Sequence, residues 1–122
     1  MLLNLTNHPS SGWPENQRQD AINAFHEIED WPFPIIPPDA QVSDIQRLAN
    51  HYIEKIQHIH PQAVHVMGEM TFSFLLVSQL LRRGIPCIAS TTQRITQQEG
   101  NTKVSTFEFV QFRPYVLASA DV

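Results

Sequence analysis

The segment Ala63–Arg94 constrains the fold most, because it reads as a strand, a helix and a second strand with both strands buried. Ala63–Met67 and Ile85–Ser90 are short apolar runs, and Thr71–Arg83 between them is apolar on nearly all sides of a helix. Two buried strands joined by a helix predict a parallel pair with a right-handed crossover. The segment therefore indicates an α/β protein.

The rest of the chain supplies the other predicted elements. They are a strand at Met1–Thr6, a helix at Pro14–Phe25, a strand at Glu27–Trp31, a helix opened by a Ser43/Gln46 capping box, a turn at Gln97–Lys103 and a strand at Lys103–Phe112. The last connection lacks a helix, so we expect the final strand to be antiparallel and at an edge. Pro32–Pro38 cannot be helical and is expected to be an extended connector with Phe33, Ile35 and Ile36 packed.

This order predicts a Rossmann-like three-layer α/β sandwich with a mostly parallel sheet and an antiparallel C-terminal edge strand. A flavodoxin-like strand order, 2-1-3-4, would make the first and third strands neighbours. We expect residues 1–116 to form a single Rossmann-like domain and residues 117–122 to form a flexible C-terminal tail.

The composition excludes several classes of protein. The net charge is -4 and the pI is about 5.8, which argues against binding to long nucleic acids. No apolar run has the length of a membrane helix, and the N-terminal residues lack the pattern of a signal peptide. We therefore expect a cytoplasmic protein that does not associate with membranes.

Three polar segments are predicted to converge at one edge of the sheet, because each follows a parallel strand. These are Asn7–Ser10, Gly68–Thr71 and Thr91–Arg94. In open α/β sheets, ligands bind outside the carboxyl ends of the strands. The sequence therefore predicts a ligand site at this edge.

Each candidate residue at this edge could also have a structural role or no role in binding. Arg94 with Thr91 and Thr92 suits a phosphate but could be a surface arginine after two ordinary strand residues. His8 could act as a general acid or be a turn residue without a role. Arg113 could reach the same edge or lie in solvent.

The start of the predicted helix is a further candidate. Gly68 permits close approach of a ligand, and the following backbone N–H groups could bind an anion. Glu69 could contact a ribose hydroxyl, act as a base, or only complement the helix N-terminus.

Metal and cofactor binding are not expected. His51 and His58 lie on roughly one helical face, but a third ligand that would complete a metal site is not evident. His65 alternates with Val64 and Val66 on a strand buried on both faces, so we expect a hydrogen-bonded core histidine.

The order of four short motifs resembles that of small single-domain CARF-like (CRISPR-associated Rossmann fold) proteins, including stand-alone ring nucleases. The motifs are Asn7-His8-Pro9-Ser10-Ser11 with Trp13 and Gln17, Gly68-Glu69-Met70-Thr71-Phe72, Ser90-Thr91-Thr92-Gln93-Arg94 and Phe107–Tyr115. The resemblance implies a homodimer that binds a cyclic oligoadenylate second messenger in CRISPR-linked antiviral signalling. It also implies cleavage by attack of the ribose 2′-hydroxyl on the adjacent phosphate, without a metal.

By this analogy, the predicted catalytic residues are His8, Glu69 and Arg94, and the predicted ligand-binding residues are Asn7, Ser10, Ser11, Gly68, Met70, Thr71, Thr91, Thr92 and Arg113. Two alternatives stay open. The chain could be a non-catalytic nucleotide sensor or sponge, or it could be a protein-interaction α/β domain that uses Pro32–Pro38 as its contact surface.

Overall fold

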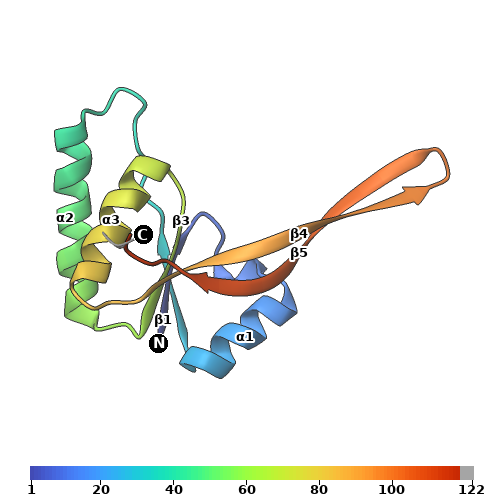
Figure 1. Cartoon of the computed structure of the whole chain (residues 1–122), viewed down its shortest axis with the longest axis horizontal. Helices are drawn as coiled ribbons and strands as arrows, with labels where there is room; N and C mark the ends of the chain where they lie inside the picture. The colour runs from blue at the N-terminus through green and yellow to red at the C-terminus, as the bar shows by residue number, and fades with distance from the viewer. Residues whose placement is uncertain (119–122) are drawn as a thin grey trace.

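A five-stranded sheet in the order β2-β1-β3-β4-β5 organises the chain in a computed structural model that describes residues 1–118 (Figure 1). The strands are β1 (Leu2–Thr6), β2 (Ile28–Pro32), β3 (Ala63–Met67), β4 (Cys87–Glu99) and β5 (Thr102–Pro114). The first four are parallel, and β5 pairs antiparallel with β4. The predicted fold class, the 2-1-3-4 order and the antiparallel edge strand are confirmed.

The helices lie on both faces of this sheet. α1 (Glu15–Phe25) covers one face, and α2 (Val42–Ile59) and α3 (Met70–Arg82) cover the other (Figure 1). A short 3-10 helix, η1 (Ser10–Gly12), connects β1 to α1. The result is the three-layer arrangement that the alternation of strands and helices predicts.

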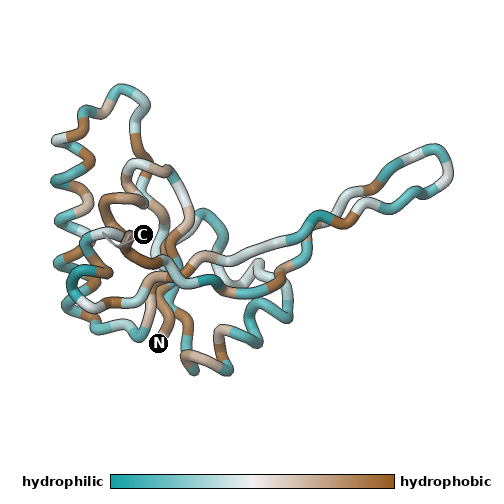
Figure 2. The backbone as a smooth tube through the Cα atoms, in the orientation of Figure 1, coloured by the Kyte–Doolittle hydropathy of each residue, from teal (hydrophilic) through white to brown (hydrophobic). Residues whose placement is uncertain are grey.

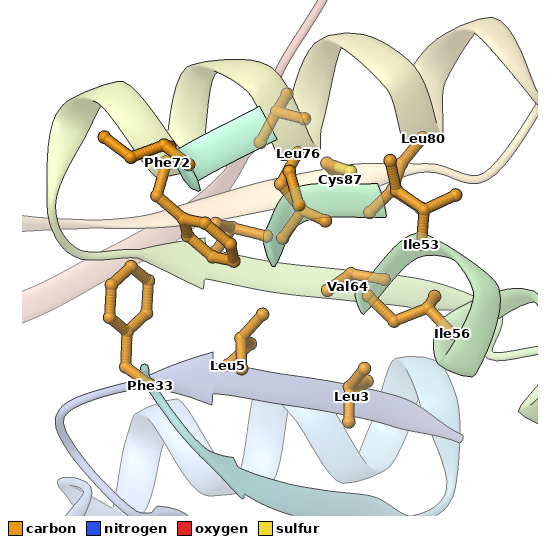
Figure 3. Packing of buried hydrophobic residues seen from close by; sticks show 14 residues of the cluster. Leu3, Leu5, Phe33, Ile53, Ile56, Val64, Phe72, Leu76, Leu80 and Cys87 are labelled. Atoms are coloured by element: carbon orange, nitrogen blue, oxygen red, sulfur yellow. The ribbon is translucent and has the colours of Figure 1, made fainter. Parts of the chain in front are cut away.

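The larger core lies between the sheet and the pair α2 and α3, as Figure 3 shows. Because successive strand residues point to opposite faces, Leu3 and Leu5 enter this core while Leu2, Asn4 and Thr6 face α1. All five residues of β1 are buried. The α1 face thus receives polar side chains where the other face is apolar.

The N-terminus of α2 differs from the prediction. The helix begins at Val42 after Gln41, and the Asp44 carboxylate accepts a hydrogen bond from the Gln41 backbone N–H at 3.0 Å. The predicted Ser43/Gln46 capping box is therefore wrong. A carboxylate in the first turn complements the positive helix end better than a neutral amide does.

The proline-rich connector is only partly packed, contrary to the prediction. Phe33 is buried and Ile36 is half-buried against the core, but the side chain of Ile35 is 93% exposed. Residues 33–37 lie outside the sheet, so no strand pairing holds the side chain of Ile35 against the core.

The main departure from prediction is a long two-stranded arm. β4 continues through Glu99 instead of ending at Ser90, and the turn is confined to Gly100 and Asn101. Because β4 pairs with β3 only at Cys87 and Ile88, the rest of the hairpin leaves the body of the sheet (Figure 1). We call residues 91–111 the arm; it is largely hydrophilic in Figure 2.

A β-bulge lies where the arm begins. Thr91 pairs with Gln111 and Thr92 with Phe109, so Val110 is the extra residue on β5. A bulge bends its strand and increases its twist, which accounts for the change of direction there. The base of the arm is held to α1 by a 3.1 Å hydrogen bond from Asn16 Nδ2 to the Phe109 carbonyl.

No helix within residues 1–118 is long and apolar enough to cross a membrane. Of the predicted C-terminal tail, residues 119–122 lie outside the described residues.

Candidate functional site

A cleft opens at the carboxyl edge of the sheet, on the face covered by α1. We call it the edge cleft; its cavity volume is about 540 Å³. Its lining residues are Thr6, Asn7, His8, Gly12, Trp13, Pro14, Gln17, His65, Met67, Gly68, Ser90, Thr92, Phe107 and Phe109. The chain leaves β1 and β3 in opposite directions here, which is the switch point where α/β proteins bind ligands.

The structure brings four of the predicted site residues to this cleft. Asn7 and His8 follow β1, Gly68 follows β3, and Thr92 stands on β4 at the base of the arm. Asn7, His8 and Thr92 are exposed, so their side chains are accessible to a ligand. The predicted convergence of three segments is thus correct in outline.

Arg94 does not belong to this cluster. It lies on the arm, exposed, and donates a hydrogen bond from Nη2 to Ser105 Oγ at 3.1 Å. The prediction placed Thr91–Arg94 in a loop at a strand end, whereas β4 continues past them. Thr91 also differs, because its hydroxyl donates to the Gln111 carbonyl at 3.1 Å.

Glu69 caps the N-terminus of α3, which is the structural one of the roles considered for it. Its carboxylate accepts from the backbone N–H groups of Thr71 at 3.0 Å and Phe72 at 2.8 Å, and from the Thr71 hydroxyl. The hydroxyl bond and then the Phe72 N–H lower the pKa of the Glu69 carboxyl. The N–H groups expected to bind a ligand anion are therefore bonded to the protein's own carboxylate.

Five other predicted binding residues lie outside the cleft lining, and one of them is Thr71, whose hydroxyl donates to Glu69. Ser10 donates from its N–H and its hydroxyl to Asp30 at 2.9 and 2.7 Å, which fixes η1. Ser11 and Arg113 are exposed at other positions. Met70 is 83% exposed and lines a separate apolar groove between α3 and the C-terminal segment.

The sequence analysis did not assign a binding role to several residues that line the cleft, some of them aromatic. Trp13, Phe107 and Phe109 supply rings, and Gln17 supplies an amide from the buried face of α1. His65 is a hydrogen-bonded core histidine, as predicted, but it also lines the cleft. Its position in the sequence could have indicated this role. His65 lies two residues before the end of β3, on the same face of the sheet as Asn4.

The chemistry of the lining is aromatic and neutral polar. No lysine or arginine is among the lining residues that the structure describes. Such a surface suits a flat heterocycle with hydrogen-bonding edges better than an isolated phosphate, which requires cationic or free N–H donors. Within residues 1–118, no group of three His, Cys, Asp or Glu side chains is placed to hold a metal ion.

Replacing Gly68 by alanine is expected to destabilise the fold by about 1–3 kcal/mol. The added Cβ would lie 2.3 Å from the Phe33 ring, which is itself buried against Phe72. Urea denaturation measures the change. Gly12→Ala is the matched control, because its Cβ would meet nothing within 4 Å in the same cleft. Equal stability of the two variants would refute the close packing of Phe33 on Gly68.

Residues 1–113 match the sequence profile of the family described as "Uncharacterized protein MJ1673 family". A search of curated proteins finds no match to the chain.

Proposed function

We propose that this chain, which belongs to the MJ1673 family, binds a small nucleotide of the cyclic oligoadenylate class with one base in the edge cleft. The observation that carries the proposal is the position and lining of the cleft. It lies at the switch point of an α/β sheet, and aromatic rings, amides and hydroxyls surround it. The resemblance of the sequence to CARF-like proteins supports the choice of ligand class.

The dimensions of the cleft support one nucleotide per chain. A cavity of about 540 Å³ lies within the range of small-molecule sites, roughly 300–1,000 Å³. A cyclic oligoadenylate is larger, so its remaining nucleotides would extend beyond the cleft. We propose that a second copy of the chain holds them, which keeps the predicted homodimer as part of the model of binding.

Binding without cleavage is the form of the proposal that the geometry favours. Of the three predicted catalytic residues, only His8 lines the cleft. Glu69 is hydrogen-bonded to its own helix and Arg94 to Ser105 on the arm. A ring nuclease must align the ribose and stabilise charge on the phosphate, and these groups do so only if they leave their present partners.

Binding is tested with a matched pair of phenylalanine variants. Phe107 lines the cleft and is 68% exposed, and Phe74 is 72% exposed on α3, away from the cleft. Calorimetry with cyclic tetra-adenylate and cyclic hexa-adenylate gives the Kd. We expect Phe107→Ala to weaken binding roughly 5- to 100-fold through lost base stacking. Phe74→Ala should bind like the parent chain.

Two outcomes decide the proposal. The proposal is refuted if neither cyclic tetra-adenylate nor cyclic hexa-adenylate binds to the protein. It is also refuted if Phe107→Ala and Phe74→Ala bind these ligands with equal affinity. Chromatography of the incubated ligand then separates the two forms of the function. Intact ligand that co-elutes with protein supports a sensor or sponge, whereas linear products that disappear in His8→Ala support a ring nuclease.

A further inference from the structure

The Nε2 atom of His65 is buried without a hydrogen-bond partner in the described part of the chain. His65 is only 2% exposed, and it is one of the residues that line the edge cleft. Buried polar atoms nearly always have partners, and each exception calls for an explanation. Because His65 lines the edge cleft, a ligand bound there is the candidate partner of Nε2.

The hydrogen bonds around Asn4 determine which nitrogen of His65 carries the proton. Asn4 Nδ2 donates to Asp30 Oδ1 at 2.8 Å and to the His8 carbonyl at 2.9 Å, so this end of the amide is the donor. Asn4 Oδ1 is then an acceptor, and it lies 2.9 Å from His65 Nδ1. Nδ1 therefore carries the hydrogen, and in a neutral ring Nε2 presents a lone pair.

The imidazole is neutral and fixed in orientation. Burial lowers its pKa to about 4. The ring packs edge-on against Trp13, with centroids 5.3 Å apart, and against Phe112, with centroids 5.5 Å apart. Trp13 Nε1 donates to the His8 carbonyl at 2.9 Å, so the indole N–H is not available to His65.

Asp30 completes the set of residues that orient the imidazole. Its carboxylate accepts from Ser10 as well as from Asn4, and these bonds outweigh the effect of burial and lower its pKa. An anionic Asp30 holds the Asn4 amide in one orientation, and Asn4 holds the His65 tautomer. Asp30 and Asn4 are thus positioning residues for the His65 lone pair.

We propose that Nε2 of His65 accepts a hydrogen bond from an N–H group on the heterocycle of the ligand, such as the exocyclic amine of adenine, and so selects the base. This inference rests on the proposed function. A nucleotide carries donors on its base and its ribose, but its ionised phosphates carry none. The aromatic rings beside His65 suit a flat base better than a ribose.

Adenosine and purine riboside test the proposal, because purine riboside lacks only the exocyclic amine. We expect adenosine to bind about 10-fold more tightly, and we expect His65→Phe to reduce this ratio to near one. A second measurement needs no variant. In ¹⁵N spectra of the parent chain, Nε2 of His65 should appear as an unprotonated nitrogen whose resonance moves on addition of adenosine but not of purine riboside.

The outcomes separate this inference from the proposed function. If both nucleosides bind with equal affinity and the His65 resonance does not move, base selection by His65 is refuted and nucleotide binding stands. If the spectra of the free protein show the hydrogen on Nε2, the inference fails regardless of binding. If no nucleoside or cyclic oligoadenylate binds, both proposals fall together.

Discussion

Replacing Phe72 by alanine is expected to lower the free energy of unfolding by about 3–5 kcal/mol. The side chain is fully buried near the start of α3 and belongs to the larger core. Its ring meets the rings of Phe33 and Tyr52 edge-on, with centroids 5.4 Å away in each case. Figure 3 shows Phe33 beside Phe72. Removal of the ring leaves a cavity that these two neighbours cannot fill without shifting from the connector and from α2. Urea denaturation followed by circular dichroism measures the loss.

Phe74→Ala is the matched control for this prediction. Phe74 lies on the same helix, two residues further on, and is 72% exposed. A surface truncation of this kind usually changes stability by less than about 0.5 kcal/mol. A similar loss in both variants would contradict the assignment of Phe72 to the core. Because Phe33 packs on Gly68, the Phe72 variant should also perturb the edge cleft.

Acidification from pH 7 to pH 4 is expected to lower the free energy of unfolding by about 3 kcal/mol through His65 alone. Burial lowers the pKa of this imidazole from 6.5 to about 4 in the folded protein. Below pH 6.5 the unfolded chain therefore binds a proton that the folded chain does not. Stability falls through this window and stops falling, as far as His65 is concerned, near pH 4. Denaturation at several pH values gives the slope.

His65→Gln isolates this contribution, because glutamine does not titrate in the window. The variant should show a shallower slope between pH 6.5 and pH 4.5 than the parent chain. Direct NMR titration provides an independent check. An imidazole of His65 that titrates near 6.5 in the folded protein would contradict both the burial and the neutral form on which base selection depends.

The architecture was predictable because burial imposes a pattern on the sequence. Ala63–Met67 was placed correctly to the residue, since a strand buried in the middle of a sheet is apolar and short. The antiparallel edge followed from the short connection without a helix, and the strand order agrees with the flavodoxin-like arrangement considered for the sequence. The positions of Asn7, His8 and Gly68 at one edge followed from the same rules.

The roles of polar residues were less predictable, because a polar side chain can bond to the protein as well as to a ligand. Glu69 and Ser10 resembled site residues in sequence, and the structure gives them partners in the protein itself. Arg94 was misplaced because the end of an apolar run was taken as the end of the strand. The apolar residues of β4 show where the strand is buried, but the strand itself continues to Glu99. β4 continues as a solvated ribbon, in which polar side chains carry no cost of burial.

By itself, the sequence determined the three-layer sandwich and the edge of the sheet where a site would lie. Only the tertiary structure decided which side chains reach that edge. The connection between Asp30, Asn4 and His65 joins residues from three strands that are adjacent in space but separated in the chain. The pattern of each strand shows which face a residue takes. Which residue of the neighbouring strand lies beside it depends on the register of the two strands, and the register is fixed only when the strands pair.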